Sequence, residues 1–151
     1  MKQAKYLFLV LIISLGCKNN EITESSARFG ESFTLKANGS TSISSSGTTD
    51  NNIKIRFSKI NFDSRCPKSM CHLSYGSTAS INLLFVNKKD TSNVSLIILG
   101  CLDEYECNDQ LYYRKDTLGY RFSLLRLDPY PNGTTPTDFA NYSVKLNVVK
   151  L

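Results

Sequence analysis

The side chains best suited to chemistry in this sequence are its five cysteines, four of which form two closely spaced pairs. Cys66 lies near Cys71, and Cys101 lies near Cys107. In an oxidising compartment each pair can close a short loop by a disulfide and so fix the shape of that loop. Pairing between the two loops and a four-thiolate zinc site are the alternatives, although zinc sites favour tighter spacings and a reducing compartment. The sequence therefore predicts two local disulfides and no metal at the cysteines.

The second cysteine loop also carries a group of carboxylates, namely Asp103, Glu104, Glu106 and Asp109. Hard oxygen ligands in a closed loop could hold calcium. Because their spacing matches no EF-hand, the favoured interpretation is a solvated acidic loop, without a metal or another cofactor. Calcium binding stays open as the alternative.

The usual catalytic groups are nearly absent. His72 is the single histidine of the chain, and no acid-base partner stands at motif distance from it. The sequence contains neither the serine hydrolase motif G-x-S-x-G nor the zinc protease motif H-E-x-x-H. We therefore predict that the protein is not an enzyme and that His72 is an ordinary exposed loop residue.

Two short segments could instead contribute to a binding surface. In Asp63-Ser64-Arg65-Cys66-Pro67 the aspartate and arginine could meet the charges of a partner. Alternatively, the carboxylate caps a turn and Arg65 packs over it, as in an Asx-turn. Tyr130 lies between Pro129 and Pro131, and its fixed backbone and large amphipathic ring suit either recognition or a simple plug over one end of the domain.

The elements that must position these residues begin with an export signal. Lys2 and Lys5 accompany an apolar run over residues 6–15 that is too short to span a bilayer, which predicts a signal peptide over residues 1–16. The end of this run, Ser14-Leu15-Gly16-Cys17, resembles the bacterial lipobox, where a small residue precedes a cysteine that is acylated and becomes the new N-terminus. The resemblance implies a palmitate-type anchor on Cys17 and a place in the bacterial cell envelope, at the outer membrane. An ordinary signal peptide or an uncleaved anchor is the alternative.

The composition excludes several classes of protein. Removal of residues 1–16, which carry Lys2 and Lys5, lowers the net charge from +5 to +3. The remaining basic side chains are scattered along the chain, which argues against nucleic-acid binding. Alanine and glutamate are scarce while serine, threonine and asparagine are abundant, so a helical bundle is excluded.

The hydrophobic pattern predicts strands. Residues 17–31 are polar and have no period, which is typical of a tether after the lipidated cysteine. Beyond them apolar and polar residues alternate with a period of two, apart from a slip after Phe57 that predicts a bulge and places Ile60 and Phe62 together on the inner face. Further predicted features are an edge strand around Ile43, an interior strand from Ala79 to Val86, a connection over residues 87–93, a short strand over residues 110–113 and strands after Val94, Tyr120 and Tyr142. The sequence thus predicts an all-β fold over residues 32–151, a single antiparallel β-sandwich that is immunoglobulin-like with seven or eight strands.

The motif Asp63-Ser64-Arg65-Cys66-Pro67, followed by a second cysteine and later by Pro129-Tyr130-Pro131, resembles a group of small bacterial envelope lipoproteins that are mostly uncharacterised. These relatives commonly place a tryptophan soon after the second cysteine, where this chain has the segment ending in Tyr75. The resemblance implies a β-sandwich lipoprotein of the envelope and no reaction. Arg65, Tyr75 and Tyr130 are accordingly the candidates for contact with a partner.

The same bacterial setting gives meaning to a three-residue pattern. Asp116-Thr117-Leu118 matches the Asp-Thr-aliphatic pattern of some bacterial O-glycosylation systems, in which Thr117 would carry the sugar. The alternative is an exposed turn between two strands.

For the whole protein the prediction is a non-catalytic binding or accessory module. It is held in the lipid bilayer by acylated Cys17 and recognises an envelope protein or a glycan, with no nucleic acid as partner. The alternative is an inhibitor of a lysozyme or a protease in the envelope.

Overall fold

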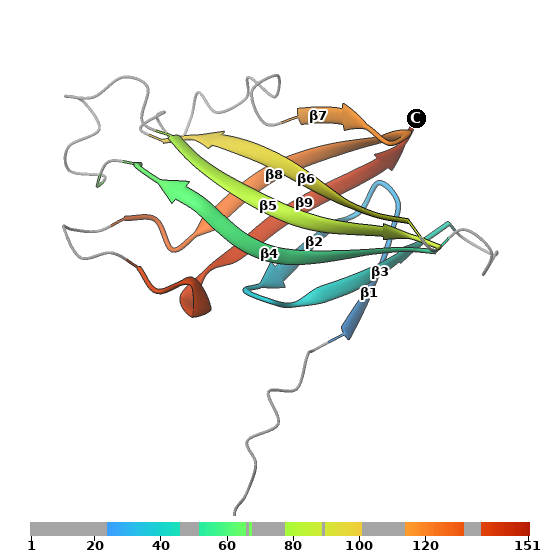
Figure 1. Cartoon of the computed structure of the whole chain (residues 1–151), viewed down its shortest axis with the longest axis horizontal. Coiled ribbons are helices and arrows are strands. Elements are labelled where there is room, and N and C mark those ends of the chain that lie inside the picture. Colours follow the sequence, from blue (N-terminus) through green and yellow to red (C-terminus); the bar gives the residue numbers. More distant parts are fainter. Residues whose placement is uncertain are drawn as a thin grey trace, which may run out of the picture.

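The computed structural model describes residues 24–45, 52–65, 67, 78–88, 90–100, 114–131 and 137–151, which form a β-sandwich of two packed sheets (Figure 1). Sheet A has five strands in the order β1 (Glu24–Arg28), β3 (Ser40–Ser44), β4 (Ile53–Asp63), β5 (Thr78–Asn87) and β6 (Asp90–Leu99). Sheet B has four strands in the order β2 (Ser32–Lys36), β9 (Ser143–Lys150), β8 (Tyr120–Asp128) and β7 (Arg114–Thr117). A short 3-10 turn, η3 (Phe139–Asn141), precedes β9. The predicted all-β sandwich is confirmed.

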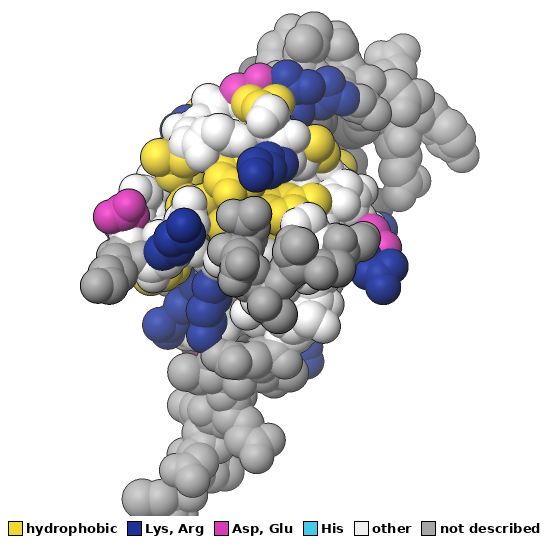
Figure 2. All heavy atoms as spheres, turned by 90° about the vertical axis from the view of Figure 1, so that its right-hand side faces the viewer, with side chains coloured by type: hydrophobic (Ala, Val, Ile, Leu, Met, Phe, Trp, Pro, Cys, Tyr) yellow, Lys and Arg dark blue, Asp and Glu magenta, His cyan; other side chains and the backbone are white. Residues whose placement is uncertain are grey.

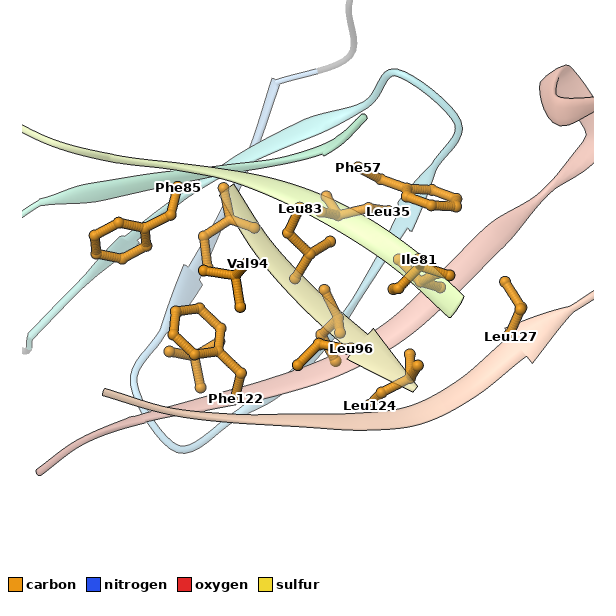
Figure 3. Packing of buried hydrophobic residues seen from close by; sticks show 14 of the residues in the cluster. Leu35, Phe57, Ile81, Leu83, Phe85, Val94, Leu96, Phe122, Leu124 and Leu127 are labelled. Atoms are coloured by element: carbon orange, nitrogen blue, oxygen red, sulfur yellow. The ribbon is translucent and has the colours of Figure 1, made fainter. Parts of the chain in front are cut away.

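The apolar residues that alternate along the strands form the core between the two sheets. In β5, Ile81, Leu83 and Phe85 point inward, and they meet Phe122 and Leu124 of β8 from the opposite sheet (Figure 3). The rings of Phe85 and Phe122 make an edge-to-face contact with centroids 5.7 Å apart. β-branched and aromatic residues dominate the inward positions because they suit a pleated surface that is buried on one side. β5 pairs with both β4 and β6, so the predicted interior position of this strand is confirmed.

Two register shifts in β4 change the predicted inner face. The first, between Phe57 and Lys59, lets Ile60 pack against the core, as the slip in the sequence predicted. The second, between Ile60 and Phe62, sets Phe62 opposite Ser80 and leaves its side chain 49% exposed. The prediction that Phe62 points inward is therefore wrong, because the sequence pattern showed one bulge and the strand contains two irregularities.

The tight turns of the sandwich are shorter than the sequence predicted. β5 and β6 are joined through Lys88 and its neighbour rather than by a connection over residues 87–93. β7 and β8 are joined by Leu118 and Gly119, which have φ values of 56° and 77°. Positive φ at both central residues is the geometry of two-residue hairpins, because it matches the twist of the flanking strands. The predicted strand over residues 110–113 lies outside the described residues.

The N-terminal strand corrects the predicted tether. Residues 24–28 form β1, which pairs in parallel with β3 through the full length of both strands. After β1 the chain crosses to sheet B, where the Gly30 amide donates to the Val148 carbonyl at 2.8 Å. The prediction of a tether up to residue 31 and of a domain from residue 32 is therefore wrong from Glu24 onward. The β3 strand that contains Ile43 is likewise not an edge strand, since β1 covers it.

The strand order also differs from the predicted immunoglobulin-like arrangement. Immunoglobulin sheets pair strands A-B-E-D and C-F-G, whereas here consecutive strands are neighbours, β3 to β6 in sheet A and β7 to β9 in sheet B. The described strands number nine rather than seven or eight, and the β1–β3 pair is parallel. No helix among the described residues is long and apolar enough to cross a membrane.

Candidate functional site

The Asp63-Ser64-Arg65 segment forms a buried polar cluster at one end of the sandwich. Asp63 is the last residue of β4, and the side chains of Arg65 and Asp63 are only 2% and 7% exposed. Arg65 donates from Nε and Nη2 to the two carboxylate oxygens of Asp63, at 2.8 and 2.7 Å. The Arg65 backbone amide also donates to Oδ1 of Asp63, at 3.2 Å. This is the local turn that an aspartate two residues earlier can make, and it presents the guanidinium in a fixed orientation.

The same guanidinium links sheet A to sheet B. Arg65 Nη1 donates to the Leu127 carbonyl at 2.7 Å, and Nη2 donates to the Pro129 carbonyl at 2.9 Å. Tyr142, just before β9, donates its hydroxyl to Oδ2 of Asp63 at 2.9 Å. We call this set the Arg65 clamp: Asp63, Arg65, Tyr142 and the carbonyls of Leu127 and Pro129. It holds the end of β4 against the end of β8 and the start of β9.

Tyr130 belongs to the surroundings of the clamp. The guanidinium carbon of Arg65 lies 5.0 Å from the centroid of the Tyr130 ring, which is a cation–π contact. The ring is half-buried, so one part of it packs on the clamp and another part meets solvent. This position agrees with a ring that covers the end of the sandwich, and it leaves an accessible part for a partner.

Burial bears on the predicted role of Arg65. Four of its N–H groups already donate to Asp63, Leu127 and Pro129, and the residue is 4% exposed. A buried guanidinium that has four of its five N–H groups engaged in this way has little left to offer a partner. This burial argues against direct contact of Arg65 with a partner, and the geometry agrees with the alternative of a carboxylate-capped turn.

The clamp carries two perturbed acids. Burial alone would raise the pKa of Asp63, but the hydrogen bonds and charge of Arg65, with the Tyr142 hydroxyl, outweigh it and hold that pKa below its ordinary value. Burial, together with the neighbouring carboxylate of Asp63, raises the pKa of the Tyr142 phenol. Both shifts favour the charge state that the clamp uses, an ionised Asp63 and a neutral Tyr142.

The depressed pKa of Asp63 predicts a loss of stability in acid. A group whose pKa is lower in the folded state stabilises the fold above its unfolded value, about 3.9, and this contribution disappears as the pH falls through the folded-state pKa. We expect Asp63→Asn to be destabilised at neutral pH and to converge with the parent as the pH drops below about 4. Urea midpoints of the two proteins across this range measure the effect. A difference that stays constant with pH would contradict it.

The other predicted sites have different outcomes. Thr117 ends β7 and is half-exposed beside the β7–β8 turn, while the preceding Asp116 accepts two hydrogen bonds from Arg121. The position agrees with a turn between strands, and modification of Thr117 stays a prediction.

Outside the described residues lie the other candidates, which are Cys17, Cys66, Cys71, His72, Tyr75, Cys101, Cys107 and the acidic residues 103–109. Among the described residues, no three His, Cys, Asp or Glu side chains come together as they would around a metal ion.

Sequence reasoning missed the distant members of the clamp. Tyr142 lies 79 residues from Asp63, and the Leu127 and Pro129 carbonyls lie 62 and 64 residues from Arg65. Tyr142 was predicted only as the start of an alternating strand, and no local pattern marks it as a partner of the carboxylate.

Comparison with known proteins adds no relative. No family model matches the chain, and no curated protein or solved structure is significantly similar to it. The resemblance to envelope lipoproteins that share the Asp63–Pro67 motif stays a prediction.

Proposed function

We propose that the protein is a bacterial envelope lipoprotein, anchored in the outer membrane through acylated Cys17, and that its sandwich is a non-catalytic binding or accessory module. The lipobox-like Ser14-Leu15-Gly16-Cys17 supports the anchor. The start of β1 at Glu24 supports a short link, since six residues separate it from Cys17. The domain therefore works close to the bilayer that holds it.

The observation that carries the binding role is the Arg65 clamp. It fixes the ends of β4 and β8, where the chain leaves the sheets for loops, and the start of β9, where the chain returns to sheet B. Loops on a rigid frame commonly carry recognition, and a frame ordered in advance lowers the entropy lost on binding. Tyr130, with its partly accessible ring, is the described residue that we place in the contact.

Anchoring is tested by Cys17→Ser. We expect the parent chain to take up radioactive palmitate and to float with membranes in a density gradient. The variant should remain unlabelled, because serine offers no thiol for the acylation. A Cys17→Ser chain that is still labelled would contradict the anchor.

The binding role is tested by capture from envelope extract with the detergent-solubilised chain. Tyr130→Ala should lose a specific partner, and Leu125→Ala, which alters an exposed side chain on the outer face of β8, should keep it. A captured glycan or transporter supports the accessory role. A captured lysozyme or protease whose activity falls on binding supports the inhibitor instead. Capture that is identical for both variants would contradict a role of this end in binding.

A further inference from the structure

The end of the sandwich opposite the Arg65 clamp exposes apolar side chains (Figure 2). Leu118 in the β7–β8 turn is 47% exposed and Leu151 after β9 is 62% exposed. They are joined through the backbone, since the Leu151 amide donates to the Gly119 carbonyl at 2.9 Å. Phe29, which is half-buried, stacks on Tyr120 with ring centroids 5.6 Å apart. We call this surface, Phe29, Leu118 and Leu151 over Tyr120, the apolar end.

Leu118 occupies its place at a conformational disadvantage. Its φ of 56° lies in the left-handed region, which a bulky L-residue adopts with strain. Two-residue hairpins with positive φ at both positions favour asparagine followed by glycine. The chain has the glycine, Gly119 with φ 77°, but places an exposed leucine before it. Neither the hairpin nor the core requires an apolar side chain there, so an external contact is the physical reason that we assign to it.

Basic side chains surround the apolar end. Arg28 precedes Phe29, Lys150 precedes Leu151, and Lys88 lies in the β5–β6 turn, three residues after Phe85, whose ring contacts Tyr120. All three are accessible to solvent, and Figure 2 shows Lys and Arg side chains around the apolar area. The acids near this end are Glu31 and Asp90 of the neighbouring turns and Asp116 of β7, which pairs with Arg121. Basic side chains therefore still outnumber acidic ones among the described residues of this end, by four to three. An apolar centre with a basic rim fits the surface of an anionic bilayer.

The length of chain before β1 lets this end reach the membrane. From Cys17 to Glu24 the chain has seven steps, which span at most about 25 Å. From Glu24 to Arg28, β1 advances about 13 Å and ends beside the apolar end, since Phe29 follows it. The possible span before β1 thus exceeds the rise of β1, and a lipid on Cys17 can share a bilayer with Leu118.

We propose that the apolar end rests on the surface of the anionic bilayer to which the chain is anchored. Leu118, Leu151 and Phe29 enter the boundary between headgroups and acyl chains, and Arg28, Lys88 and Lys150 meet lipid phosphates. The proposal rests on the proposed lipid anchor for its geometry. It adds a second membrane contact that turns the Arg65 clamp, at the other end, away from the bilayer.

The chain contains no tryptophan, so the fluorescence of a single introduced indole reports on its own position only. We place a single indole by Leu118→Trp and, as the matched control, by Leu125→Trp, whose parent leucine is 49% exposed on the outer face of β8. The anchored proteins are compared on vesicles of phosphatidylcholine with and without phosphatidylglycerol. On the anionic vesicles, the indole at 118 should shift its emission to the blue and be quenched by brominated acyl chains. The indole at 125 should do neither, and equal behaviour of the two would overturn the proposal.

A second pair of variants separates membrane contact from folding. Leu118→Asn suits the turn better, so its urea midpoint should equal or exceed that of the parent. Loss of a buried leucine should nevertheless weaken docking about tenfold or more. Acetylation of Lys150, slowed by anionic vesicles in the parent, should then recover its free rate in Leu118→Asn and stay slow in Leu125→Asn. Lys145, on the outer face of sheet B, is the internal reference. Unchanged protection of Lys150 in Leu118→Asn would overturn the proposal.

Failure of the anchor and failure of docking have different signatures. High salt weakens electrostatic docking but does not release an acylated chain, so a chain that no longer floats with membranes at high salt has no lipid anchor. The indole and Lys150 measurements test docking separately, because they also work with vesicles added to an unanchored chain. An indole at 118 that is already buried without vesicles, and more so at higher protein concentration, would assign the apolar end to a second copy of the chain and overturn the membrane contact. A sugar found on Thr117 in the intact mass from the native host would also overturn it, because it would hold the neighbouring Leu118 away from lipid.

Discussion

Arg65→Ala is expected to destabilise the sandwich by about 3–5 kcal/mol. The variant leaves the buried carboxylate of Asp63 without its counter-ion and leaves the Leu127 and Pro129 carbonyls without their donor. Removal of one member of a buried ion pair is costly because the remaining charge is uncompensated in a poorly solvated site. Urea unfolding followed by circular dichroism measures the loss. Arg65→Lys should recover only part of it, since one ammonium cannot reproduce the planar fork that serves Asp63 and both carbonyls.

The chain offers a matched control for this prediction. Arg121 and Asp116 also form a two-point pair, at 2.8 and 2.7 Å, but on the outer face of sheet B with side chains 41% and 46% exposed. Solvent screens such a pair, and surface ion pairs contribute little to stability. Arg121→Ala should therefore leave the urea midpoint nearly unchanged. A loss similar to that of Arg65→Ala would mean that burial is not what gives the clamp its strength.

The clamp shows which part of a site can be read from sequence. The turn formed by Asp63 and Arg65 is local, two residues long, and was among the two interpretations of the motif. The other acceptors of the guanidinium are distant in sequence, because the carbonyls of Leu127 and Pro129 lie at the end of β8 and just after it, in the other sheet. Which sheet ends meet depends on strand order, and the hydrophobic period of a strand does not specify its neighbours. A charged pair that looked exposed in the sequence is therefore buried in the fold.

The fold was predictable where side chains enter the core. Strands β5 and β9 and the part of β8 up to Leu124 have clean alternation, and their predicted inner faces are the buried ones. β1 was missed because Glu-Ser-Ser-Ala-Arg contains neither β-branched nor aromatic residues and shows no apolar period. Its pairing with β3 uses backbone groups, which every sequence offers. The tether and the strand therefore look alike in composition.

Phe57→Ala is expected to cost about 3–5 kcal/mol of folding free energy. Phe57 is fully buried, and its ring packs edge-to-face on Phe139 with centroids 5.2 Å apart. Truncation removes apolar area from the core and leaves a cavity between β4 and η3 that the neighbouring strands cannot fill without moving. The urea midpoint should fall with little change in the slope of the transition, because the unfolded chain exposes nearly the same surface.

Phe62→Ala is the matched substitution in the same strand, and it should change stability by no more than about 0.5 kcal/mol. Phe62 is 49% exposed opposite Ser80, beyond the second register shift of β4. A single bulge, as the alternation of the sequence indicated, would place Phe62 inward and make the two substitutions similarly costly. The two residues thus differ in effect only if the second irregularity is present. A loss for Phe62→Ala as large as that for Phe57→Ala would contradict the register of β4 and restore the inner face that the sequence pattern alone predicts.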